Sequence, residues 1–381
     1  MNEAANKIKN IENQGMVSDM NENQITSLHV KGFKSIRDAE IELNDINVFI
    51  GANGSGKSNL ISLFTLLQSI ADGRLTHYIS SNGLDSVFHY GIKTTQTLEV
   101  DFRFGYNGYG FQLRPGQSGS AFFEKEWFYW NLRGNSFLPS GRTESQWRTG
   151  TKSMIDYYVQ PILEKHKWRV YHFHDTGKTS PMKQVCSIND NIELATDAHN
   201  IAAFLYRLKN TDEVCYRRIV STVRLVAPFF SDFILRPNPF NESVISLEWV
   251  TQNSDTPFSA SQLSDGTLRF ICLACLLMQP QSLKPETIII DEPELGLHPA
   301  AIAVLAGIIR SVSTSNQLVL STQSVDLLNE FEAKDIIVVD RIDGASTFTR
   351  LEEEVLKVWL DDDYSIGDLW KKNIIGGRPD R

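Results

Sequence analysis

The sequence predicts an α/β fold, and three observations lead to that prediction. The apolar stretch 46–50 runs directly into a glycine-rich turn, after which apolar residues recur at helical spacing from Leu60 to Ile70. A second short apolar stretch, 287–290, ends in two adjacent acidic residues. Alternating apolar and polar residues from Leu98 to Phe104 indicate antiparallel strands between these two parts. We therefore expect strands and helices to share one core.

The glycine-rich turn matches the phosphate-binding P-loop pattern GxxxxGK[ST]. Its glycines let the backbone curl until successive N–H groups point at phosphate oxygens, and the following helix offers its N-terminus to the same anion. Lys57 is expected to reach the outer phosphates and the Ser58 hydroxyl to ligate Mg²⁺. The predicted cofactors are ATP and Mg²⁺, and the predicted nucleotide-binding residues of this turn are Gly51, Ala52, Asn53, Gly54, Ser55, Gly56, Lys57, Ser58 and Asn59.

The acidic pair Asp291-Glu292 supplies the second half of the predicted site. Mg²⁺ prefers oxygen ligands and keeps part of its hydration shell, so a carboxylate at a strand end can hold it, commonly through water. Asp291 is the predicted ligand, together with Ser58. Glu292 is placed to polarise the attacking water as a general base, with Lys57 as a second catalytic residue. The pairing of this Walker B arrangement with a P-loop predicts ATP hydrolysis.

A third motif lies shortly before the acidic strand. Leu263-Ser264-Asp265-Gly266-Thr267 resembles the ABC signature Leu-Ser-Gly-Gly-Gln, with Asp265 and Thr267 as departures. The resemblance implies that this segment opens a helix facing the γ-phosphate held by another subunit. Ser264 would then supply a hydroxyl and Gly266 a backbone N–H, with Asp265 between them in the site. An ordinary Ser/Asp helix cap is the alternative interpretation.

Two segments after the acidic pair extend this resemblance. Pro293-Glu-Leu-Gly-Leu-His-Pro299 is similar to the D-loop of RecF, SMC and OLD-type ATPases rather than to that of ABC transporters. A further predicted strand ends in Thr322-Gln323-Ser324, where many relatives carry a His that senses the γ-phosphate. Glutamine can donate a hydrogen bond but cannot take up a proton. Gln323 is therefore a predicted catalytic residue, with a lowered hydrolysis rate as the expected consequence.

From about residue 28 to residue 379 the chain resembles a bacterial group of AAA-family ATPases whose heads are similar to those of RecF, SMC and OLD proteins. The motifs that carry the resemblance are Gly32-Phe-Lys-Ser-Ile36, Tyr171-His-Phe-His-Asp175, Leu263-Ser-Asp-Gly-Thr-Leu-Arg-Phe270, Thr322-Gln-Ser324 and Leu369-Trp-Lys-Lys-Asn-Ile-Ile-Gly-Gly-Arg-Pro379. It implies an ABC-type P-loop NTPase head with an antiparallel β subdomain and a helical insertion. No heptad run is present, so no coiled coil is expected.

The same resemblance implies a homodimer that closes on two Mg·ATP and loosens on hydrolysis. Its interface would include Asn53, Ser264, Gly266 and residues 295–299. Five segments are expected along the chain: a mobile tail, an N-terminal ATPase lobe with the P-loop and the β subdomain, a helical and basic insertion lobe, a C-terminal ATPase lobe, and a C-terminal extension. Their ranges are 1–24, 25–142, 143–250, 251–343 and 344–381. The helical character is expected from about 143 to 233.

Composition limits the classes of protein that fit. The 381 residues are 41% hydrophobic and 22% charged, which suits a globular core, and no apolar run is long enough to span a membrane. Four cysteines are too few for a disulfide framework in such a chain, which favours a reducing cytoplasm. Cys272-x-x-Cys275 could be half of a zinc or redox site, but its apolar neighbours favour a buried helix.

Charge leaves nucleic-acid binding open. The net charge of −9 argues against a basic coat, yet basic residues gather in the middle of the chain and could track phosphates or form a normally solvated surface. They are Arg142, Arg148, Lys152, Lys165, Lys167, Arg169, Lys178, Lys183, Arg207, Lys209, Arg217, Arg218 and Arg224.

Tyr171-His172-Phe173-His174-Asp175 allows two functional interpretations. His172 and His174 alternate on one face of a predicted strand and Asp175 follows, which are metal-ligand types, but the sequence offers no further ligand. Alternatively, this strand end takes the place of the ABC Q-loop, which joins the two lobes near the γ-phosphate.

Three roles are compatible with these motifs. The first is an ATP-driven switch that regulates a separately encoded effector, such as a nuclease or toxin, in bacterial anti-phage defence. It is favoured by the isolated head and by the lack of a nuclease motif in the sequence. The second is a RecF-like DNA repair or maintenance ATPase, favoured by the basic middle segment. The energising subunit of an ABC transporter is the third, and the D-loop and signature departures disfavour it.

Overall fold

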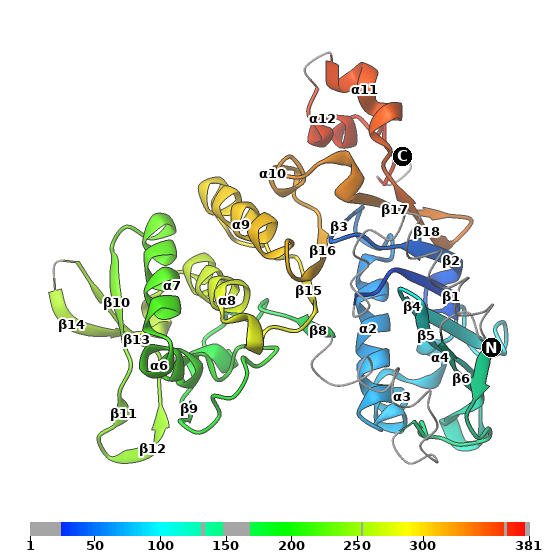
Figure 1. Ribbon diagram of the computed structural model, residues 1–381, viewed down its shortest axis with the longest axis horizontal. Helices are drawn as coiled ribbons and strands as arrows, with labels where there is room; N and C mark the ends of the chain where they lie inside the picture. The colour runs from blue at the N-terminus through cyan, green and yellow to red at the C-terminus, as the bar shows by residue number, and fades with distance from the viewer. Residues whose placement is uncertain (1–23, 131–133, 148–167, 253, 362–363, 378–381) are drawn as a thin grey trace, which may run out of the picture.

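The computed structural model describes residues 24–130, 134–147, 168–252, 254–361 and 364–377 (Figure 1). A six-stranded sheet with the order β18-β17-β3-β16-β15-β8 forms its centre, and all neighbours pair in parallel except β18 with β17. Its strands are β3 (Ile46–Ile50), β8 (Trp168–Tyr171), β15 (Thr287–Asp291), β16 (Gln317–Thr322), β17 (Ile336–Ile342) and β18 (Ala345–Arg350). The predicted α/β class is confirmed.

The central sheet is buried on both faces because its strands are apolar at nearly every position. Phe49, Ile289 and Val319 belong to a hydrophobic core on one face, whereas their neighbours Val48 and Ile290 belong to the core on the opposite face. Successive side chains of a strand point to opposite faces, so continuous apolar runs are what a doubly covered parallel sheet requires.

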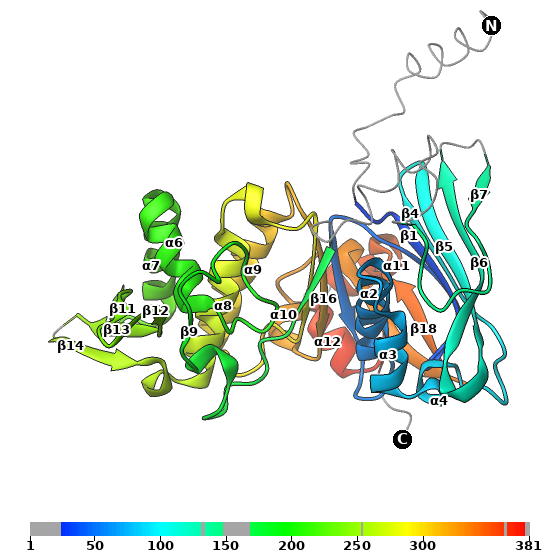
Figure 2. The ribbon, with the colours of Figure 1, turned by 90° about the horizontal axis from the view of Figure 1, so that it is seen from below.

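The first face is covered by a helix and a second large sheet. Figure 2 shows α2 between the central sheet and the antiparallel sheet of order β2-β1-β4-β5-β6-β7. This layer contains β1 (Ser27–Phe33), β2 (Ile36–Glu42), α2 (Lys57–Ala71), α3 (Leu75–Asn82), α4 (Leu84–Val87), β4 (Leu98–Phe104), β5 (Asn107–Pro115), β6 (Ala121–Trp130) and β7 (Asn135–Phe137). The predicted antiparallel β subdomain is this sheet.

The opposite face is covered by helices, with two three-stranded sheets beyond them (Figure 1). The elements on this side are β9 (Cys186–Ser187), α6 (Ile201–Thr211), α7 (Glu213–Val226), β10 (Phe230–Ile234), β11 (Pro237–Asn238), β12 (Asn241–Ile245), β13 (Glu248–Thr251), β14 (Ser254–Ser259), α8 (Asp265–Met278), α9 (Pro299–Val312) and α10 (Val325–Leu328). The last helices are α11 (Glu353–Asp361) and α12 (Ile366–Lys371).

The prediction of mainly helical structure from 143 to 233 is wrong for residues 168–200. These residues form β8, the short strand β9 and irregular chain, and the helices α6 and α7 follow only afterwards. Short polar side chains hold the backbone here in turns, as when Asp175 accepts from the Gly177 N–H and Asn200 accepts from the Ala195 N–H. Such local bonds compete with a helix. Residues 148–167 lie outside the described part of the chain.

Two further expectations concern the cysteine pair of a possible zinc or redox site and the possibility of membrane-spanning helices. Cys272 and Cys275 are free and buried on α8, as the apolar context predicts. Within the described ranges, none of the helices has the length and apolar character needed to cross a bilayer.

Candidate functional site

The topology brings the separate sequence motifs to one edge of the central sheet. Ile50, at the end of β3, pairs with Thr322 at the end of β16, and Ser321 pairs with Asp291 at the end of β15. Tyr171, at the end of β8, pairs with Ile290. Because these strands are parallel, the segments that follow them emerge at the same carboxyl edge, where α/β proteins commonly bind ligands. The P-loop, Asp291-Glu292, Gln323 and His172–His174 therefore converge.

The P-loop adopts a conformation that only its glycines make easy. Gly54 and Gly56 have φ angles of 82° and 120°. A Cβ on Gly56 would lie 2.0 Å from the Ser346 hydroxyl oxygen, so no larger residue fits. Lys57 Nζ donates to the carbonyl oxygens of Gly51 (2.6 Å) and Ala52 (3.0 Å), across the mouth of the loop. Burial lowers the pKa of Lys57, and the nearby carboxylates of β15 and its loop oppose this shift.

These residues fit the phosphates of ATP. Ser55 is buried, and its hydroxyl has no hydrogen-bond partner among the described residues. Asn53 and Ser58 are exposed at the same loop, and Ser58 stands in the first turn of the fifteen-residue helix α2. An exposed helix N-terminus with an inward-curled loop is the arrangement that binds phosphate.

An open cavity of about 820 Å³ adjoins the P-loop and was not foreseen from the sequence. It is lined by Lys34 and Ser35 of the β1–β2 turn, by Asn59 of α2, and by Tyr90 and Arg341. The Asn59 side-chain amide donates to the Ser35 hydroxyl at 2.6 Å, which fixes the P-loop helix against this turn. The volume falls within the range of small-molecule pockets.

The acidic pair is held in a specific backbone conformation. Glu292 has a φ angle of 42°, which is unusual for a residue with a side chain, and its N–H donates to the Ser321 carbonyl at 2.9 Å. Gln323 Nε2 donates to Glu292 Oε1 at 2.5 Å, and the Ser321 hydroxyl donates to Asp291 Oδ1. The two carboxylates are thus oriented by the neighbouring strand β16. The predicted catalytic pair Glu292 and Gln323 is in direct contact.

A second buried carboxylate, Glu294, was missed at the sequence level. Its Oε1 accepts hydrogen bonds from the Thr322 hydroxyl and from the Gln323 N–H (3.2 Å). Its Oε2 has no hydrogen-bond partner among the described residues, and burial raises the pKa of this carboxyl. Glu294 therefore positions the Gln323 segment, and Gln323 in turn holds Glu292.

The signature-like segment begins α8, as predicted. Ser264 is the N-cap of this helix, and its hydroxyl oxygen accepts from the Thr267 N–H at 3.1 Å. The segment therefore forms the helix cap that the alternative interpretation expected. Ser264 and Asp265 are nevertheless exposed at the helix N-terminus. A Cβ on Gly266 would lie 2.3 Å from the Gly296 carbonyl oxygen, so this glycine packs directly on the D-loop-like segment. His298 and Pro299 begin α9, with His298 as its N-cap.

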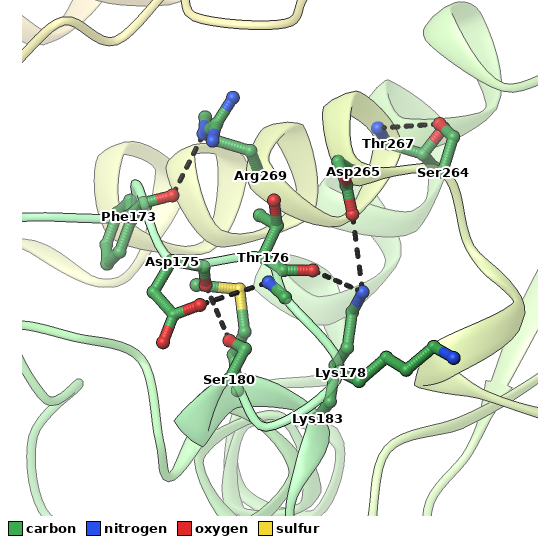
Figure 3. A network of polar contacts seen from close by, with 12 residues as sticks. Phe173, Asp175, Thr176, Lys178, Ser180, Lys183, Ser264, Asp265, Thr267 and Arg269 are labelled. Atoms are coloured by element: carbon green, nitrogen blue, oxygen red, sulfur yellow. Dashed lines mark hydrogen bonds and ion pairs between the residues drawn. The ribbon is translucent and has the colours of Figure 1, made fainter.

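Arg269, a buried residue of α8, ties three segments together and was also missed. Figure 3 shows its side chain reaching the segment after β8, where Nε donates to the Phe173 carbonyl at 2.9 Å. Its other nitrogens donate to the carbonyl oxygens of His174 (3.0 Å) and Leu295. Desolvation by burial lowers the pKa of the guanidinium, and Asp265 is first among the nearby acids that oppose this. One side chain thus connects α8, the D-loop-like segment and the chain after β8.

A second link joins the same two elements in Figure 3. Lys183 Nζ donates to the Thr176 carbonyl at 2.6 Å and pairs with Asp265 Oδ1 at 3.3 Å. The Asp265 side chain, which departs from the usual signature glycine, is therefore turned toward residues 176–183. The placement of this segment beside Asp291 and α8 supports the Q-loop hypothesis, since His174 Nε2 lies 2.8 Å from the Asp291 carbonyl oxygen.

The C-terminal segment also contacts the P-loop, which the sequence did not predict. The Ala52 N–H donates to the Gly377 carbonyl at 2.7 Å. The Gly377 N–H donates to Asp340 Oδ2 at 3.2 Å, next to the end of β17. Residues more than 300 positions apart therefore share one wall of the site.

Some of the described basic residues of the middle segment form ion pairs with acidic neighbours. Arg169 pairs with Glu193, and Arg217 pairs with Glu213 at 2.6 Å. Lys209 lies 4.0 Å from an Asp232 carboxylate oxygen. Arg148, Lys152, Lys165 and Lys167 lie outside the described residues. Among the described residues of the predicted basic stripe, four of nine form ion pairs, Arg169, Lys183, Lys209 and Arg217, so its charge is only partly neutralised.

Comparisons with known proteins agree with this geometry. A family model described as "AAA domain, putative AbiEii toxin, Type IV TA system" matches residues 46–329. No curated protein matches the chain by sequence.

Solved structures of SMC heads share the fold. An SMC head bound to the C-terminal winged-helix domain of ScpA is 19% identical, with a TM-score of 0.56, covering 87% of this chain and 99% of its own. An SMC head with an extended coiled coil bound to the C-terminal domain of ScpA, from Pyrococcus furiosus, is 17% identical, with a TM-score of 0.55. The match covers 89% of this chain and 99% of that one. An SMC head with a coiled coil and joint from Pyrococcus yayanosii is 14% identical, with a TM-score of 0.50. The match covers 89% of this chain and 99% of that one. At these identities the likeness establishes the fold alone.

Proposed function

We propose a function on the premise that this chain belongs to the AAA-domain family whose model matches residues 46–329 and has the ABC-type head fold of SMC proteins. The chain acts as an ATP-dependent switch: it binds and slowly hydrolyses Mg·ATP across a homodimer interface. The observation that carries this proposal is the convergence of the P-loop, the Asp291-Glu292 pair and Gln323 at one sheet edge, with Gln323 bonded to Glu292.

Each residue has a defined part in hydrolysis. Lys57 leaves the Gly51 and Ala52 carbonyls to bind the outer phosphates, while the P-loop N–H groups hold their oxygens. Ser58 and Asp291 would hold Mg²⁺, which neutralises phosphate charge when bound. Glu292, oriented by Gln323, accepts the proton of the attacking water. Because Gln323 cannot itself take up a proton, it orients the base but adds no second acid–base group.

The homodimer follows from where the signature-like segment stands. Ser264 and Gly266 lie at the exposed N-terminus of the fourteen-residue helix α8, whose positive dipole end is suited to a phosphate. Gly266 packs against Gly296, so the signature-like and D-loop-like segments form one continuous surface. In the proposed dimer this surface, with Asn53, covers the nucleotide on the partner's P-loop. ATP then closes the dimer and hydrolysis loosens it.

The partner is a separately encoded effector, such as a nuclease or toxin, in a bacterial cytoplasm. The matched family is described as a putative toxin of a type IV toxin–antitoxin system, which is a system of two proteins, and two of the similar SMC heads were solved with a domain of another protein bound. This favours anti-phage defence over the RecF-like alternative. The pairing of Arg169 and Arg217 with acidic neighbours also leaves less free positive charge for DNA.

A co-purification tests the proposal. Tagged Glu292→Gln should bind ATP, fail to hydrolyse it and accumulate as the closed dimer, so it is expressed with its neighbouring genes and trapped with Mg·ATP. Lys57→Ala, which should not bind ATP, is the matched control. A stoichiometric second protein retained by Glu292→Gln but not by Lys57→Ala supports the switch. Duplex DNA without a partner protein supports the RecF-like clamp, and native hydrolysis by Glu292→Gln contradicts the assignment of the base.

A further inference from the structure

The two histidines that follow β8 meet a third metal-ligand residue from the neighbouring strand. One ligand atom each of His172, His174 and Asp291 lies within 4.8 Å of the other two. The imidazole centroids of His172 and His174 are 6.0 Å apart. A metal–imidazole bond of roughly 2 Å on each side lets both rings reach one ion at this separation. The sequence offered two ligands, and the pairing of β8 with β15 supplies the third.

The hydrogen bonds of this cluster leave ligand lone pairs available. His174 Nε2 lies 2.8 Å from the Asp291 carbonyl oxygen, which only accepts, so the N–H is at Nε2 and Nδ1 is unprotonated in the neutral ring. Metal-binding histidines usually fix their tautomer by such a bond to a carbonyl or carboxylate. The Ser321 hydroxyl donates to Asp291 Oδ1, and within the described residues no donor contacts Oδ2. The His172 ring makes no hydrogen bond to the described residues.

The backbone that carries the cluster is fixed from both sides. Arg269 donates to the carbonyl oxygens of Phe173 and His174, and the His172 N–H donates to the Thr196 carbonyl at 2.9 Å. These contacts hold the two imidazoles beside the end of β15. A ligand set whose backbone is held by fixed contacts is what a defined coordination geometry requires.

One residue of the cluster, His172, borders an open cavity. His172 is exposed and lines a cavity of about 600 Å³ between α2 and residues 190–200. Lys57 of the P-loop donates to the Gly51 and Ala52 carbonyls rather than to Asp291. The cluster is therefore open to an ion without displacing a salt bridge.

We propose that His172, His174 and Asp291 form a binding site for one late first-row divalent ion, of the class of Zn²⁺ or Co²⁺. Two imidazole nitrogens and one carboxylate suit these ions, whereas Mg²⁺ prefers oxygen ligands throughout. This ion site is separate in function from the proposed ATPase and binds its ion in the absence of nucleotide. It shares Asp291 with the predicted Mg²⁺ ligands, so occupation by the transition ion competes with Mg·ATP at that carboxylate.

The test is metal binding to the full chain, stripped of metals and free of nucleotide. Co²⁺ is followed by its visible ligand-field absorption and Zn²⁺ by titration calorimetry. The wild type should bind one ion per chain. His172→Ala should weaken binding by at least the ~10–100-fold that loss of an outer-shell partner costs, since it removes a ligand itself. Asp291→Asn is a second variant with the same expected direction.

The control is His199→Ala. His199 is a described histidine outside the cluster, and its ring nitrogens lie 2.9 Å from Asp190 and 2.6 Å from Asp197. Its variant should bind Co²⁺ and Zn²⁺ like the wild type. The proposal is overturned if the wild type binds neither ion, if His172→Ala and Asp291→Asn both retain native affinity, or if His199→Ala loses it. No nucleotide enters this assay, so its failure leaves the proposed ATPase standing, and ATP affinity is measured separately.

Discussion

Replacing Gly266 by alanine should disable turnover without disturbing the P-loop. The added Cβ would lie 2.3 Å from the Gly296 carbonyl oxygen and 3.2 Å from its carbon, where ordinary contacts begin at 3.4 Å. The start of α8 and the D-loop-like segment must therefore separate by about 1 Å, and a misplacement of this size costs on the order of 100-fold in rate. We expect kcat to fall about 100-fold, or about 2.7 kcal/mol in the barrier.

Steady-state kinetics and equilibrium ATP binding together check this prediction. Binding of ATP to the isolated chain should stay near the wild-type level, because Gly51–Ser58 are distant in sequence from α8 and hold the phosphates themselves. Gly307→Ala is the matched control: Gly307 lies within α9 and a Cβ there meets nothing within 4 Å. It should keep the native kcat and gain roughly 0.4–1 kcal/mol of stability. Native turnover by Gly266→Ala would refute the argument.

Three other predictions follow from the site. Arg269→Lys, which keeps the charge but cannot make all three hydrogen bonds, should lower kcat by at least ~10-fold with little change in ATP affinity, and unchanged kinetics would remove its positioning role. Because burial raises the pKa of Glu294, folding stability should fall as pH rises from the unfolded-state pKa through the raised value. Glu294→Gln cannot ionise and should flatten the part of the urea-denaturation profile that lies above the ordinary glutamate pKa of about 4, whereas a parallel profile would contradict the assignment. Deleting the chain from Asn373 onward removes the Gly377 carbonyl that accepts from the Ala52 N–H. This deletion should weaken ATP binding while thermal unfolding stays cooperative. Native ATP affinity of the shortened chain would show that this contact is dispensable.

The sequence predicted the elements of the site whose chemistry is local. The P-loop and the Asp291-Glu292 strand could be recognised because adjacent residues carry the pattern, and a parallel sheet brings strand ends together whatever lies between them. The α/β class and the antiparallel subdomain were predicted for the same reason. The helical expectation failed at residues 168–200, where polar side chains bond their own backbone.

Residues that act through distant partners could not be predicted. Arg269 was visible as the one charged residue in the apolar stretch from Leu268 to Met278, which signals a buried partner, but its carbonyl acceptors lie on two other segments. Glu294 follows the acidic pair closely and was overlooked because its partners stand on β16. The contact of Gly377 with the P-loop depends on the path of the C-terminal chain, for which no local pattern exists.

Mixing two inactive variants tests most directly whether the nucleotide site is shared between subunits. Lys57→Ala removes the phosphate-binding lysine, and Ser264→Arg places a large side chain at the exposed start of α8. In a mixed dimer one composite site carries both defects and the other carries none. With random pairing half of the dimers are mixed, so the equal mixture should recover about a quarter of the wild-type ATPase rate. A mixture no more active than its separate components would contradict a site built from the P-loop of one chain and the signature-like segment of the other.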